Sequence, residues 1–287
     1  MAEADRLFEA AAAAMQARPL DLAAARELFL RAAIAGSLKA AVVHSTFVAS
    51  GVGAPPDWSA GVGLLRGLSR HNRRSAAELA VIEAMALTPE GDPVEVPEGE
   101  RLSDAPHVTL FRGFFSQAEC AYLIDAATPM LEPSVVVDAA TGRQVEHPVR
   151  TSDGTGFTWP LENPAVHALN RRIAAASGTA PEQGEPLQVL RYRPGQQYRT
   201  HYDAVPGFEN QRVLTMIVWL NDGYEGGETS FPAANLSLKG QAGDALLFRN
   251  VGADGRRDPA AAHAGLPVTA GEKLLASRWI RERRFDP

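Results

Sequence analysis

The sequence predicts an α+β protein, in which an all-helical N-terminal region precedes a domain rich in β-strands. Alanine and leucine recur at helical spacing before residue 88, whereas after Gly178 short apolar runs alternate with turn residues. The side chains best suited to bind a metal fall on these predicted strands. Together these observations favour a double-stranded β-helix (jelly roll) with flanking helices, preceded by helical hairpins. We place the domain boundary near residue 100, which gives a helical region with a linker at 1–100 and a second domain at 101–287.

Composition and charge narrow the class of protein. The chain has 287 residues, of which 45% are hydrophobic and 22% charged, as in ordinary soluble globular proteins. The net charge of −6 argues against a general nucleic-acid binder. Cys120 is the only cysteine, so no intrachain disulfide can form and a reducing compartment fits. The N-terminus is acidic where a signal peptide would be basic, and no run of about 18 apolar residues occurs. We therefore expect a cytoplasmic protein without a membrane span.

The first hundred residues have the pattern of stacked helices. A faint self-similarity at a shift of 35 residues relates Leu30-Arg31 to Leu65-Arg66. A period in the mid-thirties suits helical hairpins that bury their apolar faces on one another. The segment from Ala35 to Asp57 resembles a degenerate Sel1-type repeat, present in at most two copies. We favour a helical cap on the second domain. The alternative is a surface that binds a protein partner or presents a substrate.

A linker is predicted from Thr88 to Pro106, because this stretch holds four prolines, six acidic residues and no helical period. Ser116 and Glu119 then form a capping box that opens a helix through Ala127, on which Cys120 is expected to pack. The further predicted elements before residue 180 are strands at 108–111 and 135–137, a hairpin turn at 141–142, a strand edge at 150–156, and a helix that starts at Asn163-Pro164, runs to Ser177 and is ended by Gly178.

Two candidate metal ligands lie one residue apart in the strand-rich part of the chain. Residues i and i+2 of an extended strand point the same way, so His201 and Asp203 can face one ion while Tyr202 turns away. His-x-Asp alone is a weak signal. The downstream sequence strengthens it, because it offers strands at 213–220, 244–248 and 274–280, a turn at Gly226-Gly227, a second histidine, His263, and Lys273.

The composition of this set indicates a type of metal centre. Two histidines and one carboxylate that leave half of the coordination sphere open are the arrangement of non-haem Fe(II) oxygenases. Lys273 lies ten positions after His263. A cation there can remain outside the metal sphere and bind the far carboxylate of a bidentate 2-oxo acid.

Several stretches together resemble the prolyl 4-hydroxylase family of 2-oxoglutarate- and Fe(II)-dependent dioxygenases. The resemblance covers roughly the C-terminal half of the chain, with a motif core at 187–283. It is carried by residues 150–154, 187–203, 211–216, 226–229 and 263–265, and by Lys273.

The resemblance implies both a reaction and a set of residue roles. His201, Asp203 and His263 would hold Fe(II), and the 2-oxo and adjacent carboxylate groups of 2-oxoglutarate would chelate that ion. Lys273 would pair with the other carboxylate, with a hydrogen bond from Tyr192, although Tyr192 could equally fill the core. 2-Oxoglutarate and O₂ would become succinate and CO₂ as a C–H bond is hydroxylated, and ascorbate is a candidate further cofactor. The related halogenases have a small residue in place of the carboxylate, so Asp203 favours hydroxylation.

The sequence specifies the substrate less closely than the chemistry. The resemblance favours a prolyl residue of a peptide or protein, and the alternative is the same chemistry on a free amino acid or small metabolite. A helical-repeat adaptor with an inactive jelly roll is a third hypothesis, against which the intact ligand set argues. The candidate substrate contacts are Arg150, with Arg143, Arg193 and Arg199 as competitors, and the two tryptophans Trp219 and Trp279, as core or pocket walls.

Overall fold

The computed structural model describes residues 2–17, 20–137, 144–146, 149–158 and 160–285. The chain divides into two compact units. The first comprises Met1–Glu95 and Phe157–Arg172, and the second Val96–Gly156 and Ile173–Pro287. The domain limits of 1–100 and 101–287 stay a prediction from the sequence.

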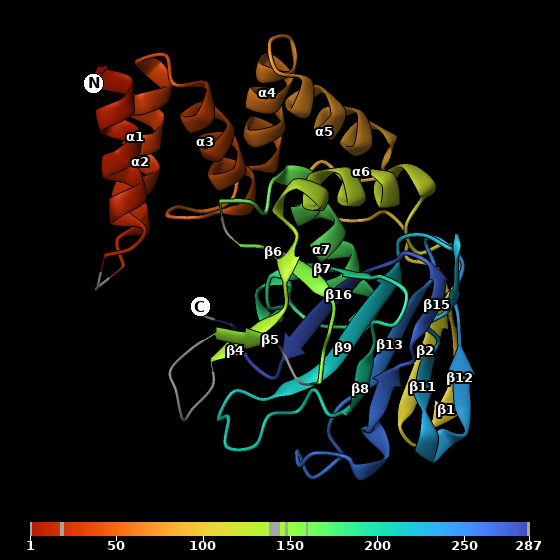
Figure 1. Cartoon of the computed structure of the whole chain (residues 1–287). Helices are drawn as coiled ribbons and strands as arrows, with labels where there is room; N and C mark the ends of the chain where they lie inside the picture. The colour runs from red at the N-terminus through yellow and green to blue at the C-terminus, as the bar shows by residue number, and fades with distance from the viewer. Residues whose placement is uncertain (1, 18–19, 138–143, 147–148, 159, 286–287) are drawn as a thin grey trace. The chain divides into compact units, whose positions relative to one another are not determined.

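The N-terminal part of the first unit is a succession of antiparallel helices, each of which packs on the next one in the chain (Figure 1). The ring of Phe29 lies at the centre of its core, in edge contact with Phe8 and Phe47 at centroid distances of 5.6 and 5.5 Å. The predicted helical-hairpin region is therefore confirmed. The helices are α1 (Glu3–Ala14), α2 (Leu22–Ile34), α3 (Leu38–Ser50), α4 (Trp58–Ser69) and α5 (Arg73–Ala84).

Short polar side chains begin most of these helices. The side chains of Asp21, Ser37, Asp57 and Asn72 each accept a hydrogen bond from a backbone N–H group in the first turn of α2, α3, α4 and α5. These bonds satisfy donors that have no partner within a helix, and each stabilises its helix by about 1 kcal/mol. The start of each of these four helices is thus specified by the local sequence.

The helix α7 (Pro164–Ser177) contributes its first half to this unit, as residues up to Arg172 cluster with the N-terminal helices. The predicted start is confirmed, since the side chain of Asn163 accepts a hydrogen bond from the N–H of Val166 at 3.1 Å. Arg171 forms an ion pair with Asp92 at 2.6 Å. Four apolar side chains in this half have no exposed surface, namely those of Ala165, Val166, Ala168 and Leu169.

A buried carboxyl group lies beside the first turn of α7. Glu78 of α5 is 4% exposed and accepts a hydrogen bond from the N–H of Ala165. Burial raises the pKa of Glu78 from 4.5 to about 8, and the bond from Ala165 opposes the shift only in part. The neutral form is therefore the one that suits the folded state.

Stability should depend on pH through Glu78. Its pKa is raised on folding, so the native state holds the proton more tightly than the unfolded chain does. The contribution of this proton to the free energy of unfolding is complete below pH 4.5 and is lost as the pH rises to about 8. Glu78→Gln should remove this dependence, so the stability of the variant relative to the wild type should rise by about 3 kcal/mol between pH 4.5 and pH 7. Thermal unfolding of both proteins from pH 5 to pH 8 tests this, because the Tm difference should grow with pH. A constant difference would contradict it.

The second unit contains two main antiparallel sheets (Figure 1). The larger sheet has the order β1-β2-β13-β9-β16-β7-β6-β3, and the smaller one has the order β12-β11-β14-β8. The larger comprises β1 (Gly99–Asp104), β2 (His107–Phe111), β13 (Ala245–Arg249), β9 (Arg212–Trp219), β16 (Lys273–Arg281), β7 (Leu187–Tyr192), β6 (Asp153–Phe157) and β3 (Glu132–Pro133). The smaller comprises β12 (Leu236–Leu238), β11 (Thr229–Phe231), β14 (His263–Gly265) and β8 (Tyr198–His201).

Two short strand pairs and a helix also belong to the second unit. β10 (Tyr224–Gly226) pairs with β15 (Val268–Gly271), and β4 (Val135–Val137) pairs with β5 (Gln144–Glu146). The helix α6 (Gln117–Ala127) begins with the predicted capping box between Ser116 and Glu119.

Alternate residues of the strands build one core from both sheets. Ile217 and Trp219 of β9 meet Phe248 of β13 and Phe231 of β11 in this core. The period of two follows from the pleat of a strand. The predicted jelly roll is therefore confirmed, with its strands at 213–220, 244–248 and 274–280 displaced by no more than one residue at either end.

The structure corrects the predicted linker. Residues 99–104 form β1, which pairs with β2 in an antiparallel hairpin whose register shifts between Arg101 and Ser103. This strand lies at the edge of the sheet and four of its six residues are exposed, so it lacks the apolar alternation that marks a half-buried strand. The hairpin turn predicted at 141–142 lies outside the described residues. None of the described helices is long and apolar enough to cross a membrane.

Candidate active site

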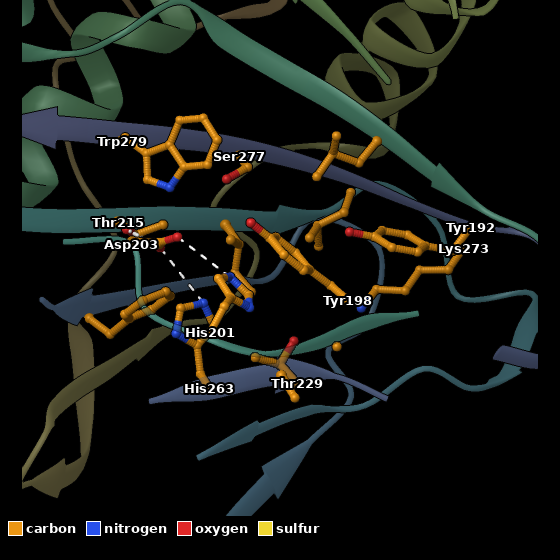
Figure 2. A pocket seen from close by; sticks show the side chains of 16 residues that line it. Tyr192, Tyr198, His201, Asp203, Thr215, Thr229, His263, Lys273, Ser277 and Trp279 are labelled. Atoms are coloured by element: carbon orange, nitrogen blue, oxygen red, sulfur yellow. Dashed lines mark hydrogen bonds and ion pairs between the residues drawn. The ribbon is translucent and has the colours of Figure 1, made fainter. Parts of the chain in front are cut away.

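A pocket in the second unit is lined by side chains from both main sheets (Figure 2). His201 and Asp203 lie at one end, and Lys273 lies at the other beside Tyr192. The rest of the lining combines apolar side chains such as Leu275 of β16 with the polar side chains of Tyr198, Thr229 and Ser277. The candidate metal ligands and the buried charge of Lys273 thus lie at opposite ends of one cavity.

The smaller sheet brings the two histidines together. His201 is the last residue of β8, and it pairs directly with His263, the first residue of β14. Asp203 was predicted to lie on the same strand as His201, but it follows two residues later, beyond the end of β8. The two side chains still converge, and Tyr202 turns away, with its hydroxyl 3.4 Å from the carbonyl oxygen of Pro259.

His201, Asp203 and His263 lie close enough together to bind one ion. Their ligand atoms all fall within 4.8 Å of one another. Asp203 Oδ1 is 3.5 Å from His201 Nε2, and Asp203 Oδ2 is 3.7 Å from His263 Nε2. This is the only group of its kind in the part of the chain that the structure describes.

Backbone carbonyl groups determine which ring nitrogens face the carboxylate as acceptors. His201 Nδ1 lies 2.8 Å from the carbonyl oxygen of Arg199, and His263 Nδ1 lies 3.1 Å from that of Ala261. A carbonyl oxygen can only accept, so each Nδ1 carries the proton. In the neutral rings, each Nε2 therefore presents a lone pair toward Asp203.

The charge state of the group follows from its burial. Burial lowers the pKa of His263, and Asp203 opposes that shift only in part, so the ring is neutral at pH 7. Burial alone would raise the pKa of Asp203, but His263, His201 and the hydroxyl of Thr215 together hold it well below its usual range. Two imidazole lone pairs and one carboxylate thus face one another. This donor set fits a divalent metal such as Fe(II).

Aromatic rings hold the two imidazoles in place. The ring of Tyr198 stacks on His201 with centroids 3.4 Å apart and an angle of 11°. The ring of Phe248 meets His263 edge-on at 4.6 Å, and that of Phe231 lies 5.5 Å from it. These contacts restrict rotation of both ligand candidates before any ion arrives.

Lys273 provides a buried positive charge at the other end of the pocket. It is 3% exposed, and its Nζ donates to the carbonyl oxygen of Gly227 at 2.7 Å. Among the described residues it forms no ion pair, although Glu228 exerts some attraction. Burial lowers the pKa of Lys273 to about 8. A buried ammonium group without a carboxylate partner fits the anionic end of a ligand.

Tyr192 lies beside this charge. It pairs with Lys273 in the ladder between β7 and β16, and Lys273 Nζ is 5.6 Å from the centre of its ring. Burial raises the pKa of Tyr192, so the hydroxyl keeps its proton and can donate a hydrogen bond. Thr229 also lines the pocket and is 4% exposed. Thr229 was not among the predicted site residues, although it ends the Gly-Gly-Glu-Thr stretch that helps to carry the family resemblance.

The structure separates the candidate substrate contacts. Trp279 lines the pocket, and the guanidinium group of Arg212 lies 3.7 Å from the centre of its ring. Trp219 does not line the pocket: it is fully buried in the core, where its ring leaves no space for a Cβ atom at Gly240. Of the two positions left open by the sequence, core or pocket wall, Trp219 thus occupies the core. Trp219 belongs to the apolar strand β9, and the sequence of such a strand does not distinguish a core residue from a pocket wall.

The described arginine candidates, Arg150, Arg193 and Arg199, are not among the residues that line the pocket. Arg150 forms an isolated bridge with Tyr198, and its Cζ lies 5.6 Å from the centre of that ring. Arg193 is exposed and forms an ion pair with Asp153 at 2.8 Å. Arg199 is exposed, and Arg143 lies outside the described residues. Arg150 thus remains a candidate through its contact with the ring of Tyr198, which lines the pocket.

Comparisons with known proteins agree with this geometry. Residues 187–281 match the family model of the 2OG-Fe(II) oxygenase superfamily. Prolyl 4-hydroxylase 1 of Arabidopsis thaliana is 40% identical over 203 residues, which cover 64% of this chain and 72% of that protein. Prolyl 4-hydroxylase 5 of the same plant is 35% identical over 248 residues, covering 76% of this chain and 84% of that protein.

A solved structure gives the same result for the fold. The viral collagen prolyl hydroxylase from Paramecium Bursaria Chlorella virus-1, in complex with 2-oxoglutarate, is 30% identical and superposes with a TM-score of 0.50. The match covers 63% of this chain and 98% of that one. The chain therefore belongs to the prolyl 4-hydroxylase family of 2-oxoglutarate- and Fe(II)-dependent dioxygenases.

Proposed function

We propose that this enzyme hydroxylates a prolyl residue of a peptide or protein, with iron held by His201, Asp203 and His263. The observation that carries the proposal is the meeting of these three side chains in one pocket that also contains the buried charge of Lys273. The family's metal cofactor, Fe(II), and its co-substrates, 2-oxoglutarate and O₂, require both features.

Each side chain has a separate task in this proposal. The iron, when bound, supplies the oxidation chemistry that hydroxylates a C–H bond. His201 and His263 offer Nε2 lone pairs, fixed by their Nδ1 bonds, and Asp203 offers one negative charge that offsets part of the ion's charge. The apolar side chains of the lining, among them Leu190, Ile217 and Leu275, limit the water that reaches the reacting groups.

Lys273, Tyr192 and Thr229 are the residues that would hold the far carboxylate of 2-oxoglutarate. Lys273→Ala should weaken binding of 2-oxoglutarate to the Mn²⁺-loaded protein about 10- to 100-fold, because a charge-assisted hydrogen bond contributes about 1.5–3 kcal/mol. Metal binding should change little. Titration calorimetry with each ligand separates the two, and an unchanged affinity for 2-oxoglutarate would remove Lys273 from this role.

The same site predicts a dependence on pH. Because the pKa of Lys273 in the free enzyme is about 8, its charge is lost as the pH rises through that value. The Kd for 2-oxoglutarate should therefore rise about tenfold between pH 7 and pH 9. Lys273→Arg keeps its charge across this range and should give a nearly flat profile, whatever its affinity at pH 7. Parallel profiles for the two proteins would contradict the assignment.

The substrate is inferred from the relatives. Those at 35–40% identity are named prolyl 4-hydroxylases, and the viral neighbour is named a collagen prolyl hydroxylase, so its substrate is a polypeptide. The alternative is the same chemistry on a free amino acid or small metabolite. Purified enzyme with iron, ascorbate and 2-oxoglutarate should be offered a proline-rich peptide and free proline. We expect a product heavier by one oxygen atom from the peptide alone, and oxidation of free proline alone would favour the alternative.

Two further parts of the sequence interpretation remain proposals. The N-terminal helices serve as a cap rather than as a docking surface for a partner, and the enzyme acts in the cytoplasm with ascorbate as an accessory reductant. Fractionation of the source cells followed by immunodetection would test the location.

A further inference from the structure

A chain of buried hydrogen bonds leads away from Asp203 into the larger sheet. The hydroxyl of Thr215 on β9 donates to Asp203 Oδ2 at 2.7 Å, and Figure 2 shows the two side chains in contact. Asn250, just after β13, donates from Nδ2 to Thr215 Oγ1 at 2.9 Å. Thr215 and Asn250 are each 1% exposed.

The direction of these bonds is fixed by the number of protons available. A threonine hydroxyl has one proton, and a carboxylate oxygen can only accept. Thr215 must therefore donate its one proton to Asp203. The second partner of the Thr215 hydroxyl must then be a donor rather than an acceptor. The amide nitrogen of Asn250 is that donor. With the amide turned the other way, two acceptors would compete for one proton.

The backbone holds Asn250 in this orientation. Its N–H donates to the carbonyl oxygen of Val213 at 3.0 Å, and its own carbonyl oxygen accepts from the N–H of Asp258 at 3.0 Å. Its side-chain Oδ1 is buried and has no hydrogen-bond partner among the described residues. A buried amide with one unsatisfied atom is costly to the fold, so selection for stability alone would favour an apolar residue here. This points to a role at the site.

We propose that Thr215 and Asn250 are positioning residues that keep Asp203 a one-oxygen ligand, so that the remaining metal positions stay open for 2-oxoglutarate and O₂. The inference rests on the proposed metal site. Both oxygens of Asp203 lie near the histidines, at 3.5 Å from His201 Nε2 and 3.7 Å from His263 Nε2. A carboxylate free to rotate could therefore bind through both.

The number of positions around an octahedral ion shows why this matters. Three protein atoms, two atoms of 2-oxoglutarate and one O₂ molecule fill six positions. A second oxygen from Asp203 would take one of them and compete with 2-oxoglutarate. The hydrogen bond from Thr215 occupies Oδ2 and opposes that rearrangement. Mutation of residues that hydrogen-bond to a metal ligand typically changes metal affinity or activity about 10- to 100-fold.

The test uses the full-length chain, without oxygen, with Co²⁺ as a spectroscopic substitute for Fe(II). Thr215→Val removes the hydroxyl but keeps the shape, and Thr215→Ser keeps the hydroxyl. Asn250→Asp replaces the donor with an acceptor, which should draw the proton of Thr215 away from Asp203. Thr46→Val is a matched control: Thr46 is equally buried, but its hydroxyl bonds to the carbonyl oxygen of Val42 in α3.

The expected result is a split between the two affinities. Thr215→Val and Asn250→Asp should bind Co²⁺ as tightly as the wild type or more so, with an altered absorption spectrum, while the Kd for 2-oxoglutarate rises about tenfold. Thr215→Ser and Thr46→Val should match the wild type. A merely structural role would instead weaken both ligands together or neither. Should Thr215→Val fail to fold, Asn250→Asp and Thr215→Ser still decide between these outcomes.

Two results would overturn different parts of the account. If His201→Ala abolishes the Co²⁺ spectrum but Thr215→Val and Asn250→Asp leave the spectrum and the 2-oxoglutarate affinity unchanged, the positioning role is wrong and the metal site stands. If the His201→Ala variant gives the same Co²⁺ spectrum as the wild type, the assignment of the metal site is wrong. The positioning role, which depends on that site, is then wrong as well.

Discussion

Alanine in place of His201, Asp203 or His263 is expected to reduce succinate formation by at least about 1,000-fold, which corresponds to about 4 kcal/mol of lost transition-state stabilisation. The reason is the geometry of the group: each residue supplies one ligand atom within 4.8 Å of the others, and nothing nearby among the described residues offers a replacement. Binding of Fe(II) or Mn²⁺ should weaken in parallel. Calorimetric titration and a succinate assay on the same preparations measure both.

The matched control for this prediction is His71→Ala. His71 is exposed in the turn between α4 and α5, so its loss should change neither metal binding nor turnover. Normal turnover in any of the three ligand variants would refute the assignment of that residue. A loss of turnover with normal metal binding would instead indicate a catalytic role without coordination.

Deletion of residues 1–95 is expected to yield an insoluble or unfolded product. The first half of α7 clusters with these residues, and its Ala165, Val166, Ala168 and Leu169 have no exposed surface in the intact chain. The deletion also removes Glu78 and Asp92, which bond to Ala165 and Arg171 of that helix. An apolar face left uncovered in this way promotes aggregation. Solubility, circular dichroism and size-exclusion chromatography measure the outcome.

Deletion of residues 1–20 is the control for this truncation. It removes α1 and its contact between Phe8 and Phe29, but it leaves every partner of α7 named above. We expect a folded, active and somewhat less stable protein. If the longer deletion instead gives a soluble and fully active fragment, the N-terminal helices are a separable module, and the interpretation as a recognition surface is the better one.

Part of the site could be predicted because two of its ligands are local in sequence. His-x-Asp places two ligands on one side of an extended backbone, and the jelly-roll ladder then pairs His201 directly with His263. That pairing joins residues 62 positions apart, which no local pattern reveals, so His263 and Lys273 could be identified only through the family resemblance. The same resemblance led to Tyr192.

Other features depend on contacts that the sequence does not encode locally. Thr215 and Asn250 look like ordinary residues of a strand and a strand end, and only the folded chain places them behind Asp203. Trp219 and Trp279 have similar local sequence settings, yet only Trp279 faces the pocket. The strand β1 could not be predicted because an exposed edge strand carries no apolar alternation.

The most direct test of the central claim is a crystal structure of the full chain grown without oxygen in the presence of Fe(II) and 2-oxoglutarate, with anomalous scattering recorded at the iron edge. The account predicts one anomalous peak bounded by His201 Nε2, His263 Nε2 and a single oxygen of Asp203, with the far carboxylate of 2-oxoglutarate against Lys273. Iron bound elsewhere, or 2-oxoglutarate absent from the Lys273 end of the pocket, would contradict it.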